Sequence, residues 1–152
     1  IVPEEEPFSR VIHQGMILSQ GKKMSKSLGN VVNPDDYDGN TLRLYMMFIG
    51  HYFDGGNWSD QNINGITRFF NKWITWMDQE GEDTIDIAIF EKMIFDYTRD
   101  FKFNKVVSSF MTLIKENKHK KLNLECRSRL KQLLNIYLPD FHKTTADPQS
   151  AI

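Results

Sequence analysis

The sequence predicts a mainly α fold, an antiparallel helical bundle preceded by a small α/β segment. The chain of 152 residues is 40% hydrophobic with only 9 glycines and 5 prolines, so it holds enough apolar side chains for a core. Apolar residues recur at three- and four-residue spacing from residue 59 onward, which is typical of amphipathic helices. Before residue 59 the apolar runs are shorter and are interrupted by glycines, which indicates smaller elements.

The first elements are expected to be a short helix and a small strand. Residues 7–14 begin with a proline that follows three glutamates, which favours a helix start, and Gly15 is expected to end that helix. Residues 16–18 are an apolar run between Gly15 and Gly21, which predicts a strand. Residues 20–30 are polar and basic and are expected to form a loop.

One short helix and one buried helix are expected next. Asn33-Pro34-Asp35-Asp36 has the order of a cap, a first-turn proline and first-turn acids, but Gly39 leaves room for barely one turn. Residues 41–49 are apolar at too many positions for a one-sided stripe, which predicts a helix buried around most of its circumference. Residues 50–57 are expected to form a loop.

Four amphipathic helices with short connections are expected in the rest of the chain, and such helices favour antiparallel packing. The apolar stripes cover residues 63–77, 87–101, 106–114 and 130–138. Ser59 is suited to cap the first of these helices, and Pro139 is suited to end the last. A polar loop is expected over residues 115–121, and residues 144–152 are expected to be a disordered tail.

The composition excludes several classes of protein. The 19 Lys and Arg against 20 Asp and Glu give a net charge of -1, so any nucleic acid must be bound by local clusters of charge. One cysteine, Cys126, excludes an internal disulfide and a cysteine-rich zinc site, and no metal site is expected at His13 or His142. No apolar run approaches the length of a membrane helix, so no membrane partner is expected and the cytoplasm is the expected location. Because the chain begins with Ile1 rather than Met, it is expected to be a piece of a longer protein.

The most informative stretch is the glycine-bracketed loop over residues 21–30, Gly-Lys-Lys-Met-Ser-Lys-Ser-Leu-Gly-Asn. Its three lysines supply compact charges on flexible stems, and its two serines supply short hydrogen bonds. The glycines allow such a loop to close over a ligand. These properties suit a mobile polyphosphate, so a nucleoside triphosphate is the expected ligand.

Within this loop, Lys23-Met24-Ser25-Lys26-Ser27 matches KMSKS, the second signature of the class I aminoacyl-tRNA synthetases. The surrounding sequence resembles the leucyl-tRNA synthetases of that family. The matching stretches include residues 7–16, 29–36, 41–45, 58–60 and 65–73. The resemblance is strong from residue 7 to about residue 77 and continues to Pro139 only as a bundle pattern.

This resemblance implies a ligase that activates leucine with ATP and Mg²⁺ and then transfers the leucyl group to tRNA(Leu). It assigns Lys26 as the main cation on the departing pyrophosphate and Lys23 as its helper. Met24, Ser25 and Ser27 complete the ATP-binding loop, and the two serines either hold its shape or bond phosphate oxygens. The other ATP-binding signature of the family, His-Ile-Gly-His, is absent. Leucine and ATP are therefore expected to be bound through an N-terminal catalytic half that this chain lacks. The fragment is expected to be inactive alone.

The same resemblance divides the chain into parts. Residues 1–58 are expected to be the end of the catalytic domain and a stem-contact segment with the KMSKS loop. Residues 59–143 are expected to be a tRNA-binding helical bundle of the anticodon-binding type. One departure from the family is the short run Tyr37-Asp38-Gly39-Asn40, which lacks about one helical turn.

Two alternatives remain beside the leucyl enzyme. One is an isoleucyl-, valyl- or methionyl-tRNA synthetase fragment, because those enzymes share the KMSKS loop and the amino-acid pocket is absent from this chain. The other is a non-catalytic tRNA-binding paralogue that kept the bundle and lost turnover. Lys22 lies outside the signature and is expected to be an ordinary solvated lysine, and His51 in Ile49-Gly50-His51 is not expected to contact ATP.

Some residues of the second half are candidates for contacts with tRNA. The basic residues 115–121, together with Arg127, Arg129 and Lys131, are either phosphate contacts or a solvated surface. Trp73 is expected in the core, whereas Trp76 is expected either at the edge of the core or stacked on RNA. The arginines among apolar residues, Arg43 and Arg68, are expected to form structural salt bridges in preference to binding a ligand.

Overall fold

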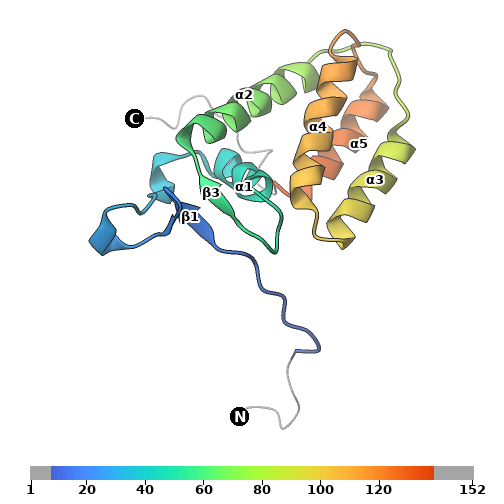
Figure 1. Cartoon of the computed structure of the whole chain (residues 1–152). Coiled ribbons are helices and arrows are strands. Elements are labelled where there is room, and N and C mark those ends of the chain that lie inside the picture. The colour runs from blue at the N-terminus through green and yellow to red at the C-terminus, as the bar shows by residue number, and fades with distance from the viewer. Residues whose placement is uncertain (1–7, 139–152) are drawn as a thin grey trace, which may run out of the picture.

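The computed structural model describes residues 8–138 and is mainly helical, with one small sheet (Figure 1). The first elements are β1 (Ile17–Ser19), β2 (Lys22–Lys23), the 3-10 helices η1 (Lys26–Leu28) and η2 (Pro34–Asp36), the helix α1 (Gly39–Phe48) and β3 (Gly56–Trp58). The longer helices follow as α2 (Asp60–Met77), α3 (Ile87–Arg99), α4 (Phe103–Asn117) and α5 (Leu124–Asn135). The predicted order of a small α/β segment and then helices is confirmed. Within residues 8–138 no helix has both the length and the apolar character needed to cross a membrane.

The small sheet has β1 as its central strand. β1 pairs antiparallel with β2 and parallel with β3, so the predicted strand exists and begins one residue later than expected. Gln20 and Gly21 join β1 to β2 with φ angles of 55° and 73°, as a two-residue hairpin turn requires. The loop predicted over residues 20–30 therefore begins as a hairpin and later contains η1.

β3 replaces the end of the loop that the sequence predicts over residues 50–57. Gly56 lies opposite Ile17 in the parallel pairing with β1. The two segments approach so closely that a Cβ added at Gly55, where φ is 75°, would collide with the carbonyl oxygen of Met16. The prediction of a loop was wrong because this strand forms by pairing with a segment distant in sequence, without apolar alternation of its own.

The helix predicted over residues 7–14 is absent from the described part of that segment, residues 8–14. Phe8 and Val11 are exposed by 67% and 65%. With no surface to pack against, so short a helix is not stable in water. Pro7 itself lies outside the described residues.

The next two helices follow the sequence closely. The side chain of Asn33 accepts a hydrogen bond from the backbone of Asp35 (3.3 Å) and caps η2. Asp38 caps α1 by accepting from the backbone of Thr41 (2.8 Å). Leu44 is buried and most other α1 side chains are at least partly buried, whereas Arg43 is exposed. The prediction of a helix buried around most of its circumference is confirmed.

The four later helices are also confirmed, with shifted ends. The hydroxyl of Ser59 accepts from the backbone of Asn62 (3.4 Å) at the start of α2, as predicted. α4 continues to Asn117, so Lys115 belongs to its last turn rather than to the predicted loop. Pro139 and the tail over residues 144–152 lie outside the described residues.

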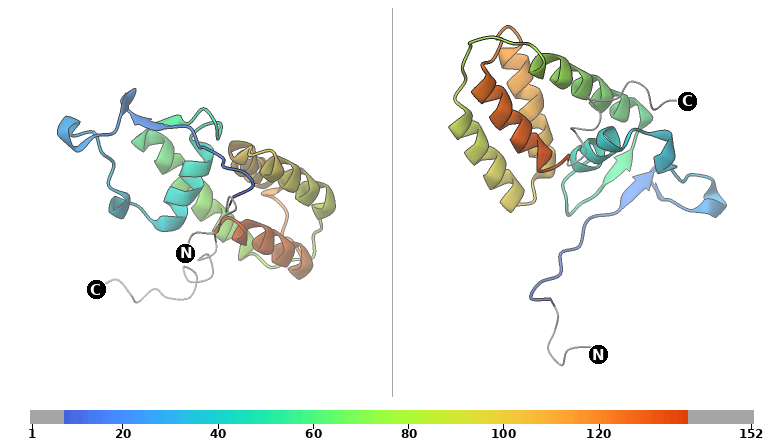
Figure 2. Two further views of the ribbon diagram at one scale, coloured as in Figure 1. Left: turned by 90° about the horizontal axis from the view of Figure 1, so that it is seen from below. Right: turned by 180° about the vertical axis from the view of Figure 1, so that it is seen from behind.

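The helices pack as three neighbours and one crossing helix. α3, α4 and α5 lie side by side, and α4 runs opposite to the other two (Figures 1 and 2). α2 approaches α4 at a steep angle, and α1 packs against both α2 and α4. The predicted antiparallel packing therefore describes α3 to α5. The burial of α1 was predicted, but its packing against α2 and α4 was not.

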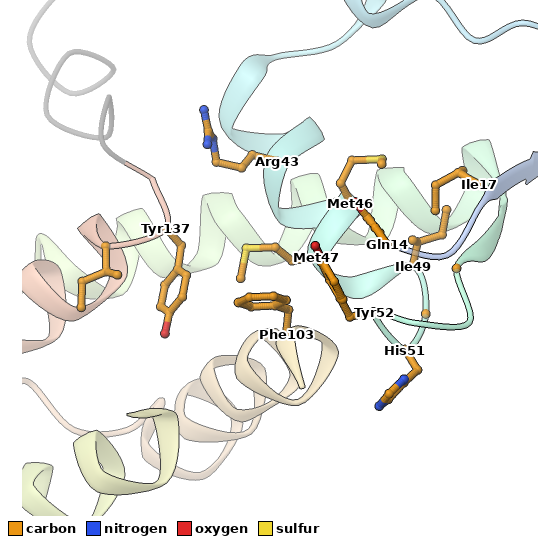
Figure 3. Close-up of a pocket in the computed structure, with 13 residues that line it drawn as sticks. Gln14, Ile17, Arg43, Met46, Met47, Ile49, His51, Tyr52, Phe103 and Tyr137 are labelled. Carbon is orange, nitrogen blue, oxygen red and sulfur yellow. The ribbon is translucent and has the colours of Figure 1, made fainter. Parts of the chain in front are cut away.

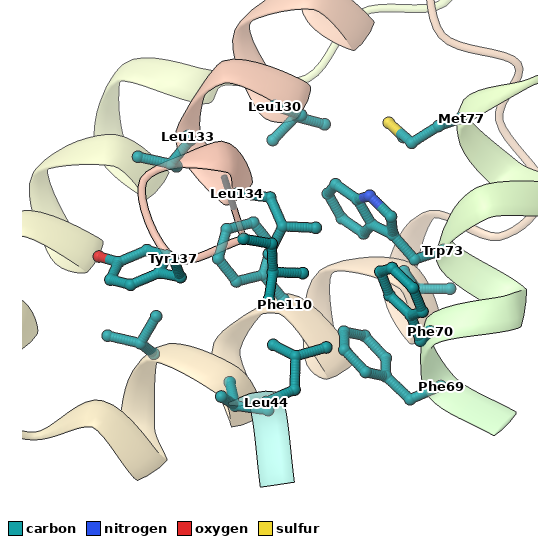
Figure 4. Close-up of a cluster of buried hydrophobic side chains, with 14 of the residues drawn as sticks. Leu44, Phe69, Phe70, Trp73, Met77, Phe110, Leu130, Leu133, Leu134 and Tyr137 are labelled. Atoms are coloured by element: carbon teal, nitrogen blue, oxygen red, sulfur yellow. The ribbon is translucent and has the colours of Figure 1, made fainter. Parts of the chain in front are cut away.

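The core is centred on Trp73, which is fully buried (Figure 4). Its ring lies edge to face with those of Phe110 (centroids 5.2 Å apart) and Trp76 (6.0 Å). Such aromatic pairs add stability beyond the area that they bury. Trp76 is also buried, and its indole N–H donates to the carbonyl oxygen of Lys120 (2.9 Å). Trp76 is therefore a core residue and does not present its ring to an RNA.

An aromatic contact joins the loop before β3 to the connection between α3 and α4. Tyr52, in the loop between α1 and β3, lies against Phe101 and Phe103, with ring centroids 5.3 and 5.5 Å apart. Phe101 has a φ of 58° and lies beyond α3, although the sequence places it in the same apolar stripe. The loop that leads into β3 is thus held by the α3–α4 connection.

Candidate functional site

The glycine-bracketed loop over residues 21–30, called the lysine loop below, projects from the edge of the sheet, away from the helices (Figure 1). Lys22 and Lys23 form β2, and Lys26 begins η1, which is followed by Gly29 with a φ of 63°. All three lysines are exposed, and none forms an ion pair with another residue between 8 and 138. Their ammonium groups are therefore available to an anionic ligand.

Asn30 holds the loop together from inside. Its side-chain oxygen accepts from the backbone N–H of Ser25 (2.8 Å), and its amide nitrogen donates to the carbonyl oxygens of Lys23 (3.2 Å) and Ser19 (3.4 Å). One amide group can make these bonds because it carries both an acceptor and two donors. It thereby links β1, β2 and the start of η1. Sequence reasoning gave Asn30 no role, because the carbonyl groups that it contacts are brought together only by the hairpin.

The two serines of the signature contact each other. The hydroxyl oxygens of Ser25 and Ser27 lie 2.7 Å apart and share a hydrogen bond. The backbone carbonyl of Ser25 also accepts from the N–H of Leu28 (3.1 Å), which closes the 3-10 turn. Lys26 is consequently carried on a defined turn rather than on a free chain.

The base of the loop is tied to the start of α2. The side-chain oxygen of Asn57 on β3 accepts from the backbone N–H of Gly21 in the hairpin turn (2.9 Å). Its neighbour Trp58 and also Tyr37 each donate to the carboxylate of Asp60 (2.9 Å each). These bonds lower the pKa of Asp60, and the bond to Asp60 raises the pKa of Tyr37. A lowered carboxylate pKa stabilises the fold above its ordinary value of 3.8, and that stabilisation is lost as the pH falls through the lowered pKa.

Known proteins supply the context for this loop. Residues 2–59 match the family described as tRNA synthetases class I (I, L, M and V). The chain belongs to this family. A leucine–tRNA ligase of Malacoplasma penetrans (strain HF-2) is 33% identical to this synthetase chain in an alignment of 152 positions, which covers 91% of the chain. The same alignment covers 19% of that ligase, so the synthetase chain spans about a fifth of the length of this relative.

Several cations of the synthetase chain that are candidates for tRNA contacts have partners within the fold. The guanidinium of Arg127 is largely buried and donates to the carbonyl oxygens of Leu122 (3.1 Å) and Met77 (3.4 Å). Arg129 forms two hydrogen bonds with the carboxylate of Glu91 (3.1 and 2.7 Å), which raise the pKa of the arginine. Arg127 and Arg129 therefore hold helices together, contrary to the idea that they face RNA.

The prediction that Arg43 and Arg68 form structural salt bridges was wrong. Neither arginine forms an ion pair in the part of the synthetase chain that the structure describes, and both are exposed. Both lie on helices whose buried faces carry their apolar neighbours, so the guanidinium groups point outward. Apolar neighbours in sequence were a poor guide because those neighbours occupy a different face of the same helix.

A cavity of about 330 Å³ lies between α1, the loop after it, and the ends of α4 and α5 (Figure 3). Met47, Tyr52 and Phe103 make most of its wall apolar, with Arg43 at one side. His51 lines the cavity, and its Nδ1 lies 3.7 Å from a carboxylate oxygen of Asp54. The loop with His51 enters β3 at the end opposite to the hairpin turn, so this histidine is remote from the lysine loop. Among residues 8–138 no three His, Cys, Asp or Glu side chains gather as a metal site, and His142 lies outside this range.

Replacing Asn30 by alanine is expected to loosen the lysine loop while leaving the helical core intact. The variant loses three hydrogen bonds at once, each of which contributes about 1 kcal/mol to local order. Limited proteolysis should cut the loop at Lys23 or Lys26 faster than in the unchanged chain, with the same helical circular dichroism. Asn33→Ala is the matched control, since it removes a nearby amide whose hydrogen bonds reach only Asp35 and Asp36 of η2. Equal cleavage rates in both variants would contradict the role assigned to Asn30.

Proposed function

We propose that the chain is part of a leucine–tRNA ligase, in which it supplies the loop that stabilises pyrophosphate and a helical bundle that binds tRNA(Leu). The observation that carries this proposal is the unaltered sequence Lys23-Met24-Ser25-Lys26-Ser27 on an ordered, exposed loop. The identity to a leucine–tRNA ligase supports leucine among the amino acids of the family. The chain alone is expected to be inactive, because it contains no His-Ile-Gly-His sequence.

In the first step, a carboxylate oxygen of leucine attacks the α-phosphorus of ATP, and the bond to the bridging oxygen of pyrophosphate breaks. Negative charge grows on the departing pyrophosphate, and Lys26 neutralises it with help from Lys23. Donors placed where charge develops lower the barrier because they need no reorganisation during the reaction. Mg²⁺ enters as the counter-ion of the ATP substrate. Met24, Ser25 and Ser27 give the loop the shape that brings both ammonium groups to the same phosphates.

In the second step, a hydroxyl of the terminal ribose of tRNA attacks the leucyl carbonyl carbon, and AMP leaves. The bundle over residues 59–143 is proposed to hold the tRNA and to be of the anticodon-binding type, while residues 1–58 end the catalytic domain. The match to the family ends at Ser59, where the cap of α2 begins, which supports this division. The ligase is proposed to act in the cytoplasm.

A panel of amino acids tests this function. The complete protein that contains this chain is assayed for ATP–pyrophosphate exchange with leucine, isoleucine, valine and methionine, since the family match includes all four. Exchange driven by leucine supports the proposal, and the 152-residue chain alone should give none. Exchange driven by another of the four amino acids but not by leucine would overturn the specificity. Binding of tRNA without any exchange would instead support a non-catalytic paralogue.

A further inference from the structure

Residues 21–36, called the flap below, form one exposed segment that includes the lysine loop. No residue of the flap is buried, and its apolar side chains Leu28 and Val31 are exposed by 60% and 48%. Burial begins again at Tyr37, which packs against the hydrophobic core. Because no apolar side chain of the flap joins that core, hydrogen bonds rather than apolar contacts must hold the flap in place.

Both ends of the flap are attached to the same short segment. At the entrance, the backbone N–H of Gly21 donates to the side-chain oxygen of Asn57 on β3 (2.9 Å). At the exit, the hydroxyl of Tyr37 donates to the carboxylate of Asp60 at the start of α2 (2.9 Å). β1 and β3 are parallel, so the chain leaves β1 at the end where β3 leads into α2 (Figure 1). The flap therefore begins and ends beside residues 57–60.

Asp60 is the centre of the exit. Its Oδ1 atom accepts a second hydrogen bond from the indole N–H of Trp58 (2.9 Å). The ring of Tyr37 meets that of Trp58 edge to face (centroids 5.3 Å apart), and Trp58 meets the buried Tyr45 of α1 in the same way (4.9 Å). The bonds from Trp58 and Tyr37 lower the pKa of Asp60, so its carboxylate is charged at neutral pH and forms stronger hydrogen bonds. The exit of the flap is thus joined to the core through one exposed carboxylate.

The positions of these two ends bear on the chemistry of the proposed function. Lys23 and Lys26 lie between them and must bring their ammonium groups to the phosphates of ATP. A displacement of about 1 Å in a catalytic group costs up to about 100-fold in rate. The bonds of Asn30 preserve the shape of the lysine loop, whereas residues 31–36 lead directly from that loop to the exit at Tyr37. Release of the exit therefore allows η1, which carries Lys26, to move.

We propose that Asp60 is a positioning residue for the activation of leucine, because it fixes the point to which the flap returns and so the place of Lys26 against ATP. The inference rests on the proposed function and adds to it a residue outside the lysine loop. Asp60 acts by accepting hydrogen bonds from Tyr37 and Trp58 and does not touch the reacting atoms. The competing role is that of a first-turn acid, whose charge stabilises the start of α2. Positioning requires an acceptor oxygen, whereas the competing role requires a negative charge.

The test compares Asp60→Ala with Asp60→Asn in the complete protein by leucine-dependent ATP–pyrophosphate exchange. Alanine removes the acceptor oxygen and should lower kcat about tenfold, whereas asparagine retains an oxygen for both donors and should stay within about threefold. In a Lys26→Ala background, Asp60→Ala should cost less than about twofold, since the lysine that it positions is gone. The control, Asp86→Ala, removes an acid that caps α3 far from the flap and should leave exchange within about twofold (Figure 1).

Amide hydrogen exchange of the 152-residue chain gives a second measurement, which needs no enzymatic activity. The hydrogen-bonded amides of the flap should exchange faster in Asp60→Ala than in Asp60→Asn. The amides of α3 to α5 should keep the rates of the unchanged chain in both variants. Asp60 is exposed, so neither substitution leaves a cavity in the core.

Four results would overturn the proposal. Equal losses of kcat in Asp60→Ala and Asp60→Asn would assign the effect to the charge at the start of α2. An undiminished effect of Asp60→Ala in the Lys26→Ala background would show that Asp60 does not act through that lysine. An unchanged kcat in Asp60→Ala, or unchanged amide exchange in its flap, would show that the exit bond does not position the flap. Absence of leucine-dependent exchange in the unchanged complete protein would instead refute the proposed function, and amide exchange would still decide whether Asp60 holds the flap.

Discussion

Lys26→Ala is expected to lower the rate of leucine-dependent ATP–pyrophosphate exchange by the complete protein at least about 100-fold. The ammonium group of Lys26 is exposed, has no ion-pair partner among residues 8–138, and is carried on the 3-10 turn η1. Its removal leaves the growing charge of pyrophosphate without its main counter-charge. Because the interaction strengthens in the transition state, the loss should appear in kcat more than in the KM for leucine.

The neighbouring Lys22 is the matched control for this prediction. It is exposed like Lys26, lies outside the signature, and points to the opposite side of β2 from Lys23. Lys22→Ala removes the same charge from the same loop, so the general field at the loop changes equally. We expect exchange within a few-fold of the unchanged rate. Equal losses in the two variants would show that only the summed charge of the loop matters.

Trp73→Ala is expected to reduce the free energy of unfolding by about 3–5 kcal/mol. Trp73 is completely buried and lies against Phe110 and Trp76, so alanine leaves a large cavity that these rings cannot fill. A domain of this size has few kcal/mol to lose, so much of the chain would be unfolded near physiological temperature. Urea unfolding of the 152-residue chain, followed by circular dichroism, measures the change.

Trp73→Phe is the control for that experiment. The indole N–H of Trp73 is buried and finds no hydrogen-bond partner among the described residues, so phenylalanine removes an unfavourable polar group. It also retains most of the aromatic volume. We expect a loss well below that of the alanine variant. Similar losses in both would indicate that the indole N–H, rather than the cavity, controls stability at this site.

The helices could be predicted from sequence because their signals are local. Ser59 caps α2, and the apolar stripe through Trp73 follows the helical period, so both depend only on nearby residues. β3 has no such signal, since Gly56 and Asn57 acquire strand geometry by pairing with β1. The helix predicted over residues 7–14 failed for the opposite reason, because a local start signal was not supported by packing.

The site was predictable in its residue types and not in its contacts. The signature over residues 23–27 was identified by its resemblance to a family, and the residue matches to that family extend beyond it. The clamp formed by Asn30 depends on the hairpin that brings the carbonyl oxygens of Ser19 and Lys23 together, which no local pattern reveals. Likewise, the sequence could not tell that Glu91 would face Arg129 while Arg68 would face no acid.

Hydrogen bonds connect the lysine loop to the first of the longer helices. The hydrogen bond from Gly21 to Asn57 links the hairpin turn to β3, and Trp58 and Asp60 link β3 to α2.

The most direct test of the role of the two lysines is the rate of leucyl-adenylate formation by the complete protein when Lys23 and Lys26 are both replaced by alanine. We expect a rate below that of either single variant and at least about 100-fold below the unchanged protein, with ATP and leucine still bound. A rate equal to that of the unchanged protein would mean that these two ammonium groups do not act on the leaving pyrophosphate.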